Sequence, residues 1–240
     1  MLALKADTGE RVWHFQVVHH DLWDYDIPCP PNLVSVEHNG RRIDAVAQVT
    51  KMGHLFVFTR ETGEPLFPVE ERPVPISDIP GEQSWPTQPF PVAPPAFAQQ
   101  RLTAAEVTDL NPGARAAGLK QLARMRTGDI YLPPGLDPAV TLPQFNGGAE
   151  WGGASFDPAT RTLYVNSSSE AEWIAMTPAK PTRDTTAAAL GATIYGATCS
   201  ACHGFERPAN PNAPSFPTLK NVKERLTRDC LLYTSDAADE

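Results

Sequence analysis

The feature that most constrains the fold is a strand–turn–strand unit that recurs along the chain. Residues 3–13 read as a strand, a Thr-Gly turn and a second strand that carries Trp13. Residues 55–67 repeat this pattern with Phe67 in place of the Trp, and residues 152–166 form a third, degenerate copy. A Thr-Gly pair suits a turn that needs a positive φ at its glycine. Three such units predict the blades of a β-propeller.

Composition agrees with an all-β architecture. The chain has 25 prolines in 240 residues, about double the ~5% average, which favours short strands and long ordered loops over helical bundles. Its net charge of −8 and its lack of a basic run argue against nucleic-acid binding, because binding phosphates requires clustered Lys and Arg. No apolar run approaches transmembrane length. The sequence leaves membrane association open.

A long excursion, residues 68–130, separates the second and third units. Its first part, Pro68–Pro95, is rich in proline and is expected to be extended loop. The part from Thr103 to Arg126 predicts one or two short helices, with Thr103 as an N-cap and Glu106 at the capping-box position. We expect this excursion to be a structural insert that packs on the rim of the propeller.

The stretch His19–Pro28 has an unusual density of polar side chains. It reads His-His-Asp-Leu-Trp-Asp-Tyr-Asp-Ile-Pro. Its carboxylates must be solvated, paired or bound to a cation. On an extended strand Asp24 and Asp26 would share one face and Asp21 would take the other. Geometry alone therefore leaves Asp24 and Asp26 as rival candidates for a catalytic base.

Two further side chains of this stretch have open alternatives. Trp23 is either a wall under a bound ring or an indole packed into the core. His19 and His20 could be metal ligands, but adjacent residues on a strand face opposite ways. We expect both histidines to be structural. Cys29, between two prolines, is expected to be a small buried side chain.

This stretch resembles the active-site segment of the quinoprotein dehydrogenases, the pyrroloquinoline quinone (PQQ) enzymes of the glucose dehydrogenase type. Their pattern is similarly His-His-Asp-Leu-Trp-Asp-x-Asp-x-Pro. The resemblance implies that Asp24 is the general base. Residues 3–13 are similar to the tryptophan-docking repeat of quinoprotein propellers, although Lys5 stands where that repeat has Asp. The implied fold is all-β, with residues 1–180 forming part of a PQQ-binding propeller built from tryptophan-docking blades.

Lys51 is the second candidate for catalysis. It follows the apolar strand Ala45–Thr50 and precedes Met52-Gly53-His54. Taken alone, this position favours a surface lysine at the end of a strand, although lysines are rarely buried without a partner. The resemblance implies an active-site lysine here that bonds the quinone oxygens of PQQ.

A glycine-rich segment, Asn146–Gly153, contains Glu-Trp-Gly-Gly. Its glycines predict either a close approach of the backbone to a ligand or a tight turn around a packed Trp. The resemblance implies that Trp151 neighbours the cofactor and that Asn166 contacts it.

Near the end of the chain, Cys199-Ser200-Ala201-Cys202-His203 has the spacing of a c-type haem attachment site. Cys199 and Cys202 would form the thioethers, and His203 would be the proximal iron ligand. A redox CxxC pair or half of a zinc site are the alternatives, but zinc needs a second ligand pair that the sequence lacks. The small helix-forming residues before this motif resemble the first helix of a cytochrome c domain. We therefore predict the start of an all-α cytochrome c domain at 187–229.

The last residues, Cys230–Glu240, back-translate to a sequence that resembles a transposon sequencing adaptor. We expect them not to belong to the natural protein. The chain would then be an internal piece of a longer enzyme, without its signal peptide, and we expect the 240-residue chain alone to be inactive.

The full protein is expected to be a periplasmic PQQ-dependent dehydrogenase that oxidises an alcohol, a polyol or an aldose sugar. Electrons would leave through haem c to a downstream cytochrome or quinone. The resemblance also implies Ca²⁺, with most of its ligands outside this chain. The alternative is an electron-transfer cytochrome whose propeller is a binding module without catalysis.

Overall fold

The structure is a computed structural model that describes residues 1–178, 186–200, 219–225 and 227. The chain divides into two units, Met1–Pro178 and Ala179–Glu240. None of the described helices combines the length and the apolar character needed to cross a membrane.

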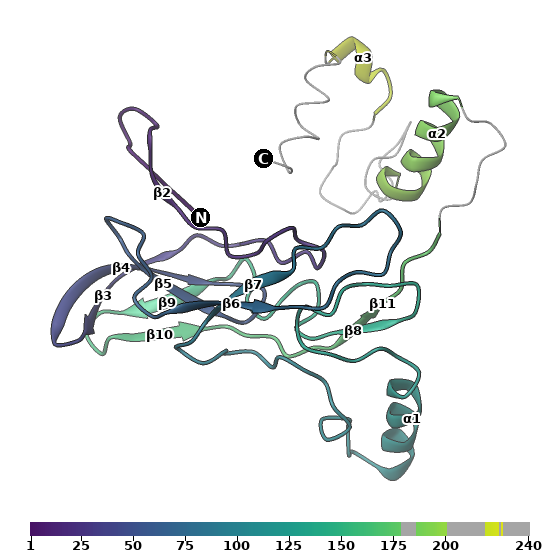
Figure 1. Ribbon diagram of the computed structural model, residues 1–240, viewed down its shortest axis with the longest axis horizontal. Helices are drawn as coiled ribbons and strands as arrows, with labels where there is room; N and C mark the ends of the chain where they lie inside the picture. Colours follow the sequence, from purple (N-terminus) through teal and green to yellow (C-terminus); the bar gives the residue numbers. More distant parts are fainter. Residues whose placement is uncertain (179–185, 201–218, 226, 228–240) are drawn as a thin grey trace. The chain divides into compact units, whose positions relative to one another are not determined.

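The first unit is built from antiparallel strands (Figure 1). The strands are β1 (Leu2–Leu4), β2 (Arg11–His14), β3 (Asn32–His38), β4 (Arg41–Val49), β5 (Leu55–Thr59), β6 (Val69–Pro73), β7 (Thr87–Pro91), β8 (Ala139–Thr141), β9 (Ala154–Asp157), β10 (Thr162–Val165) and β11 (Glu172–Ile174). One three-stranded sheet has the order β3-β4-β5, and the other pairs are β1–β2, β6–β7, β9–β10 and β8–β11.

The three-stranded sheet forms the centre of the packing. Its β3–β4 hairpin turns at Asn39-Gly40, where both residues have positive φ, as tight hairpin turns require. The strand β4 becomes completely buried from Ala45 to Val49. Side chains alternate across the sheet. Phe56 and Phe58 of β5 therefore join one core cluster, while Val57 joins another that also contacts the β9–β10 hairpin.

The predicted strand–turn–strand units are confirmed, with one difference. The first is the hairpin β1–β2 and the third is the hairpin β9–β10. In the second unit, β5 is followed by its Thr-Gly turn and then by a single bridge between Phe58 and Pro65. Phe67 does not dock as a Trp would, because its ring packs edge-on against His38.

The indole of Trp13 docks onto the turn of the next unit. Its Nε1 donates a hydrogen bond of 3.0 Å to the carbonyl of Arg60. Gly63 has φ +73°, and a Cβ placed there would lie 2.5 to 2.7 Å from ring atoms of Trp13. The glycine therefore supplies both the turn conformation and the flat surface on which the indole rests.

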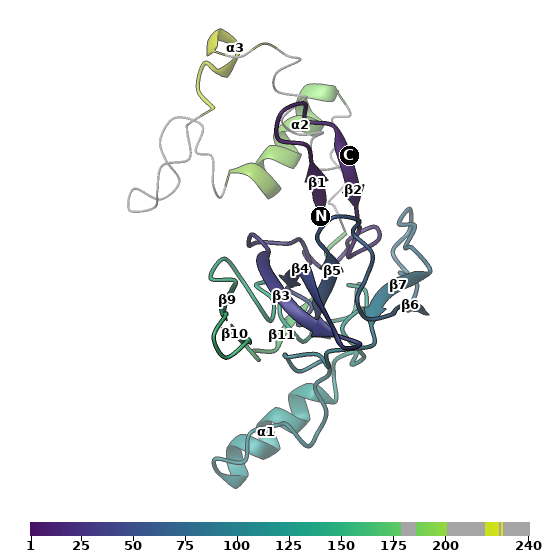
Figure 2. The same ribbon diagram turned by 90° about the vertical axis from the view of Figure 1, so that its left-hand side faces the viewer.

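The expectation that Pro68–Pro95 is extended loop is wrong in part, because this segment contains the antiparallel pair β6–β7. The excursion also contains one helix, α1 (Pro112–Leu122), which extends away from the sheets (Figure 2). Asn111 caps it by accepting a hydrogen bond from the backbone N–H of Ala114. The prediction that Thr103 is a helix N-cap is wrong. Thr103 does pair with Glu106, but these bonds close a turn before the helix because Asn-Pro-Gly sets the helix start further on.

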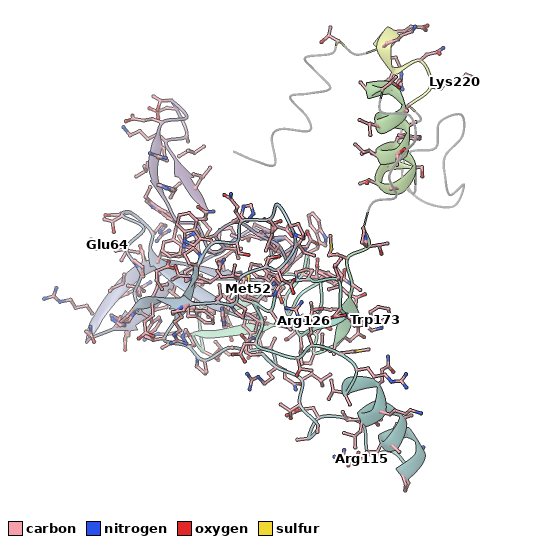
Figure 3. The ribbon with its side chains drawn as sticks, turned by 45° about the vertical axis from the view of Figure 1, so that its right-hand side comes forward. Met52, Glu64, Arg115, Arg126, Trp173 and Lys220 are labelled. Carbon is pink, nitrogen blue, oxygen red and sulfur yellow. The ribbon has the colours of Figure 1, made fainter. Side chains whose placement is uncertain are left out.

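Helix α1 has no fully buried residue. Arg115 ties it to the preceding loop by donating to the carbonyls of Val107 and Ala104. Figure 3 shows Arg115 on this helix, apart from the dense interior around Met52, whose side chain is completely buried. The helix thus adds surface to the first unit and no buried side chain to its core.

The second unit contains α2 (Ala187–Ile194), a π-helix at Tyr195–Cys199 and α3 (Val222–Arg225). Thr186 caps α2 by accepting from the N–H of Ala189 at 3.3 Å. The predicted small-residue helix before the Cys motif is present and ends in a π-helical turn. A groove of about 500 Å³ in this unit is lined by Gly191, Ala192, Tyr195, Leu219 and Val222.

A buried histidine lies in the main aromatic core. His54 packs its ring 6.3 Å from that of Phe56 and 5.6 Å from that of Phe90, centroid to centroid. Its Nδ1 has no hydrogen-bond partner among the described residues. Burial lowers the pKa of His54 to about 4, an interaction with Gln100 offsets part of this, and the charge of Arg72 adds to the lowering.

We expect Gly63→Ala to destabilise the protein more than Gly9→Ala. Both glycines have positive φ, but a Cβ at Gly9 meets nothing within 4 Å. The backbone strain is therefore common to both variants, and overpacking against Trp13 adds about 1–3 kcal/mol in Gly63→Ala alone. Urea unfolding of the cofactor-free protein, followed by tryptophan fluorescence, measures the difference. Equal midpoints for the two variants would contradict the docking of Trp13 on this turn.

The second prediction concerns acid stability. Because the pKa of folded His54 is about 4 against the ordinary 6.5, the unfolded chain binds its proton first as the pH falls. The contribution of His54 to the free energy of unfolding is fully present above pH ~6.5. It is lost as the pH falls towards ~4, and the total loss is about 3 kcal/mol. The variant His54→Gln cannot titrate and should lose less stability between pH 7 and pH 5 than the wild type. If the urea midpoints of the variant and the wild type fell by the same amount between pH 7 and pH 5, His54 would not be buried as a neutral ring.

Candidate active site

The candidate site centres on Lys51, at the end of the central strand β4. The strand runs into a turn that closes with a hydrogen bond of 3.0 Å from the N–H of Gly53 to the carbonyl of Thr50. Gly53 has φ +77°, and a Cβ there would lie 2.5 Å from that of Ala98. The turn is therefore packed tightly on both sides. It leaves the side chain of Lys51 only 8% exposed.

Carboxylates surround the ammonium group of Lys51. Its Nζ lies 2.5 Å from Oδ1 of Asp26, 3.1 Å from Oδ2 of Asp24 and 3.9 Å from Oε1 of Glu150. Burial alone would lower the pKa of Lys51, but its contacts with Asp26 and Asp24 raise it above the ordinary value. The lysine is therefore held as a cation at neutral pH. The structure brings together Lys51 and both rival aspartates of the predicted site.

The aspartates do not lie on an extended strand, so that expectation is wrong. The segment between β2 and β3 contains no strand, and Asp24 adopts φ +59°, the left-handed region that Asp tolerates better than most residues. Asp21 accepts a hydrogen bond of 2.9 Å from the N–H of Trp23. Burial raises the pKa of Asp21, backbone hydrogen bonds partly oppose this, and the neighbouring carboxylates add to the rise.

Two buried aromatic side chains anchor the loop between β2 and β3 to the core. Trp23 is completely buried and donates from Nε1 to the carbonyl of Leu132 at 3.0 Å. Tyr25, equally buried, donates to the carbonyl of Pro143 at 3.0 Å. Burial raises the pKa of Tyr25 far above its usual range, and the charge of Asp21 adds to this. Trp23 is thus an anchor in the core and does not form a wall of the site.

The excursion holds the start of the same loop. Gln88 on β7 is completely buried and pairs with the backbone of His19 in both directions: its Oε1 accepts at 2.8 Å and its Nε2 donates at 2.6 Å. Nε2 of His19 lies 2.9 Å from Glu71, and Nε2 of His20 lies 2.7 Å from Glu82. The two histidines therefore tie the loop to the excursion, as their expected structural role requires.

The glycine-rich segment packs directly against Lys51. A Cβ at Gly147 would lie 2.4 to 2.5 Å from atoms of Lys51, and Gly147 has φ +82°. The N–H of Gly148 donates to the carbonyl of Lys51 at 2.6 Å, and the carbonyl of Gly148 accepts from Ser168 at 3.0 Å. The glycines allow a close approach of this segment to the lysine. They also place Glu150 beside the ammonium group.

The other predicted residues have mixed outcomes. Trp151 is 81% exposed, so its ring is available to a ligand and is not packed. Asn166 is exposed directly after β10, two residues before the Ser168 that joins the glycine-rich segment. Cys199 ends the π-helix of the second unit with its thiol free. Cys202 and His203 lie outside the described residues, as do Cys230–Glu240.

Sequence reasoning missed two contributors. Glu150 belongs to the motif that carried the resemblance, yet it had no role until its distance to Lys51 was known. Gln88 lies in the proline-rich excursion, where no sequence signal marks it. Its reach across 69 positions to His19 depends on the tertiary fold.

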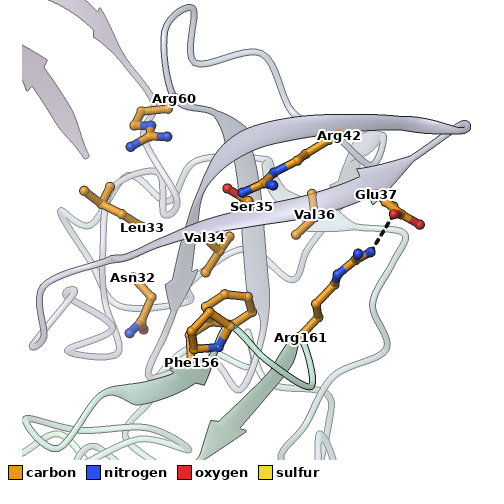
Figure 4. A pocket seen from close by; sticks show the side chains of 11 residues that line it. Asn32, Leu33, Val34, Ser35, Val36, Glu37, Arg42, Arg60, Phe156 and Arg161 are labelled. Carbon is orange, nitrogen blue, oxygen red and sulfur yellow. Dashed lines mark ion pairs between the residues drawn. The ribbon is translucent and has the colours of Figure 1, made fainter.

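A groove elsewhere in the first unit contains none of the candidate residues. It has a volume of about 540 Å³ and lies between β3 and the β9–β10 turn (Figure 4). An ion pair of 2.6 Å between Arg161 and Glu37 spans it. Among the described residues, no group of three or more His, Cys, Asp or Glu side chains is arranged to hold a metal ion.

The chain is similar in sequence to known proteins. The sequence profile of the family "PQQ: Glucose/ethanol/alcohol dehydrogenase, beta-propeller domain" matches residues 1–209. The chain is 37% identical over 182 residues to the quinate/shikimate dehydrogenase (quinone) of Acinetobacter baylyi, covering 75% of this chain and 22% of that protein. It is 34% identical over 200 residues to quinoprotein glucose dehydrogenase A of Acinetobacter calcoaceticus, covering 80% of this chain and 24% of that protein.

A shorter match is 38% identical over 64 residues to a quinohemoprotein alcohol dehydrogenase of Pseudomonas putida and covers 27% of this chain and 9% of that protein. The chain thus spans roughly a quarter, or less, of the length of these curated relatives. The family profile nevertheless covers most of it. The chain therefore belongs to the PQQ-dependent glucose/ethanol/alcohol dehydrogenase family and forms part of its β-propeller domain.

Proposed function

We propose that this chain supplies the catalytic base and a cofactor-binding lysine to a PQQ-dependent dehydrogenase of alcohols, polyols or aldose sugars. The observation that carries the proposal is the buried ammonium of Lys51 between the exposed carboxylates of Asp24 and Asp26. A lysine ammonium has more N–H donors than these two carboxylates use, so a donor remains for a further acceptor. The carboxylates remain accessible to a substrate hydroxyl.

The residues present fit PQQ, a planar quinone that carries carboxylate groups. The ammonium of Lys51 can donate to its oxygens, and the exposed indole of Trp151 offers an aromatic surface for its ring system. The glycines beside Lys51 allow the backbone to approach closely. Asn166, exposed after β10, would add an amide contact. When bound, PQQ supplies the two-electron acceptor that no side chain of the chain can provide.

In the proposed mechanism, Asp24 accepts the proton of the substrate hydroxyl. Its carboxylate is 68% exposed, so a substrate can reach it and the proton can afterwards leave to solvent. Lys51 stays protonated and orients the cofactor oxygens by hydrogen bonding. The anchored rings of Trp23 and Tyr25 keep the loop rigid, which fixes the position of the base.

The second unit supports a proposal of electron transfer through a c-type haem. The supporting observations are the Cys-x-x-Cys-His spacing at Cys199–His203, the helix that leads into Cys199 and the similarity to a quinohemoprotein. The apolar groove of the second unit has room beside this helix. Haem attachment and PQQ would both place the protein in the periplasm, with a cytochrome or a quinone as the next acceptor.

Calcium is a different case. The resemblance implies Ca²⁺ near the cofactor, but the described residues contain no group of three or more His, Cys, Asp or Glu side chains that could hold it. No step of the mechanism above depends on a metal ion. The alternative function, an electron-transfer cytochrome with a non-catalytic propeller, gives no reason for a buried lysine beside two exposed aspartates. Dye reduction with alcohols or sugars, with and without added PQQ, distinguishes the two functions.

The third prediction concerns the base. In the full-length protein, Asp24→Asn keeps the shape of the side chain and removes the proton acceptor, so turnover at saturating PQQ should fall by about 10²–10⁴-fold. The affinity for PQQ should change much less, because Lys51 and Asn166 remain. Steady-state rates after reconstitution with PQQ measure the effect.

The matched control is Asp26→Asn, which we expect to have a smaller effect on turnover at saturating PQQ. The two residues lie two positions apart, and both contact Lys51. The assignment is wrong if Asp24→Asn keeps turnover within about threefold of wild type while Asp26→Asn is inactive. The base would then be Asp26.

The fourth prediction concerns the haem. Expressed in a periplasm with haem-attachment machinery, the full-length protein should show a c-type band in its alkaline pyridine spectrum. The double variant Cys199→Ala/Cys202→Ala should lose this band, whereas Cys29→Ala should keep it because Cys29 is buried in the first unit. His203→Ala should keep the covalent haem and change the iron spectrum. A wild-type protein without the c-type band would overturn the haem proposal.

A further inference from the structure

The two aspartates beside Lys51 are not equivalent. The Asp26 carboxylate is 0.6 Å closer to the ammonium nitrogen than that of Asp24, at 2.5 Å against 3.1 Å. Their side chains are similarly exposed, at 58% and 68%, so solvent screening does not distinguish them. The Asp26 contact is shorter than the ~2.7–2.9 Å typical of a charge-assisted N–H···O bond, and the hydrogen bond to Asp24 is longer. Asp26 therefore provides the stronger attraction for the buried cation.

The backbone holds both aspartates in place. Tyr25 lies between the two aspartates, and its hydroxyl is within hydrogen-bonding distance of the carbonyls of Ile130 and Pro143. Asp26 follows this anchor and precedes Ile27-Pro28, where proline restricts the chain on its N-terminal side. Asp24 lies between the buried rings of Trp23 and Tyr25 and has φ +59°. Both aspartates are thus held from both sides, and the difference lies in where the ammonium group sits between them.

The stem of Lys51 is fixed as well. Gly147 packs against its Cα, Cβ and Cγ so closely that no side chain fits there. The stem cannot swing towards the glycine-rich segment. Glu150, whose Oε1 is 3.9 Å from Nζ, lies beyond hydrogen-bonding distance. The position of the ammonium group along the line between Asp24 and Asp26 is therefore the remaining freedom.

We propose that Asp26 is a positioning residue: it draws the ammonium of Lys51 towards itself, so that the hydrogen bond from Lys51 to Asp24 stays long, at 3.1 Å, and the Asp24 carboxylate remains available as an acceptor. Without the charge of Asp26, Lys51 would shorten this bond and close the ion pair with Asp24. A base in such a pair has less capacity to accept a proton from a substrate. The catalytic consequence rests on the proposed function, whereas the control of Lys51 by Asp26 does not.

The fifth prediction tests this control without any cofactor. Competitive labelling of lysines with acetic anhydride, read by mass spectrometry over a range of pH, reports how readily each ammonium loses its proton. An adjacent carboxylate is typically worth about 1–3 pKa units. Asp26→Asn should therefore raise the labelling rate of Lys51 at pH 9 by roughly tenfold or more, and by more than Asp24→Asn does. Glu150→Gln should have the smallest effect of the three.

Lys5 is the internal reference, because its ion pair with Glu10 lies in the distant β1–β2 hairpin. Its labelling should be the same in every variant. The proposal is overturned if Asp24→Asn raises the rate at Lys51 as much as Asp26→Asn does. If Asp26→Asn fails to fold, Asp26→Glu replaces it in the test, because this variant keeps the charge. Lys51 must then be labelled more slowly in Asp26→Glu than in Asp24→Asn. A faster rate in Asp26→Glu would also overturn the proposal.

Reconstitution separates this inference from the proposed function. We expect Asp26→Asn to raise the PQQ concentration needed for half-maximal activity by a larger factor than it lowers turnover at saturation, because it displaces Lys51. A wild-type protein without PQQ-dependent turnover would defeat the proposed function, yet the order of labelling rates would still decide the role of Asp26. Normal PQQ dependence in Asp26→Asn would show that the position of Lys51 does not depend on Asp26.

Discussion

The structure of the first unit depends on how it accommodates one buried cation. An ammonium group with a side chain only 8% exposed is costly unless carboxylates lie within direct contact. Those carboxylates come from two segments distant in sequence, the loop before β3 and the glycine-rich segment before β9. Lys51 itself ends the central strand. The fold brings three separate parts of the chain to one point. The buried ammonium group is stable only with the carboxylates beside it, so these parts stabilise one another.

Mutually repelling carboxylates need a rigid support, and the aromatic core provides it. Trp23 and Tyr25 alternate with the aspartates of the loop, and their rings stack 6.2 Å apart inside the core. Burial of such rings contributes several kcal/mol, which exceeds the repulsion between partly exposed charges in water. The polar residues can thus point outward because the residues between them point inward. The excursion adds a second support through the buried amide of Gln88.

Much of this arrangement could be predicted from the sequence, because local patterns determine it. The Thr-Gly turns fix the hairpins, and the motif with its resemblance brings together Asp24, Lys51 and the glycine-rich segment. The conformation of the loop could not be predicted, since no local pattern requires φ +59° at Asp24. The role of Trp23 as an anchor depends on a carbonyl 109 positions away. Residue spacing cannot predict a contact between residues so far apart in the sequence.

The docking of Trp13 also orders events during synthesis. Its partner carbonyl lies 47 positions later in the chain, so the indole has no place to dock when the β1–β2 hairpin first leaves the ribosome. At about 5–20 residues per second, that gap lasts roughly 2 to 10 seconds. In the finished fold Leu2 and Leu4 of this hairpin are still more than half exposed. Until Arg60 has been synthesised, the indole of Trp13 is therefore without this partner, and the hairpin is without its contact to the turn after β5.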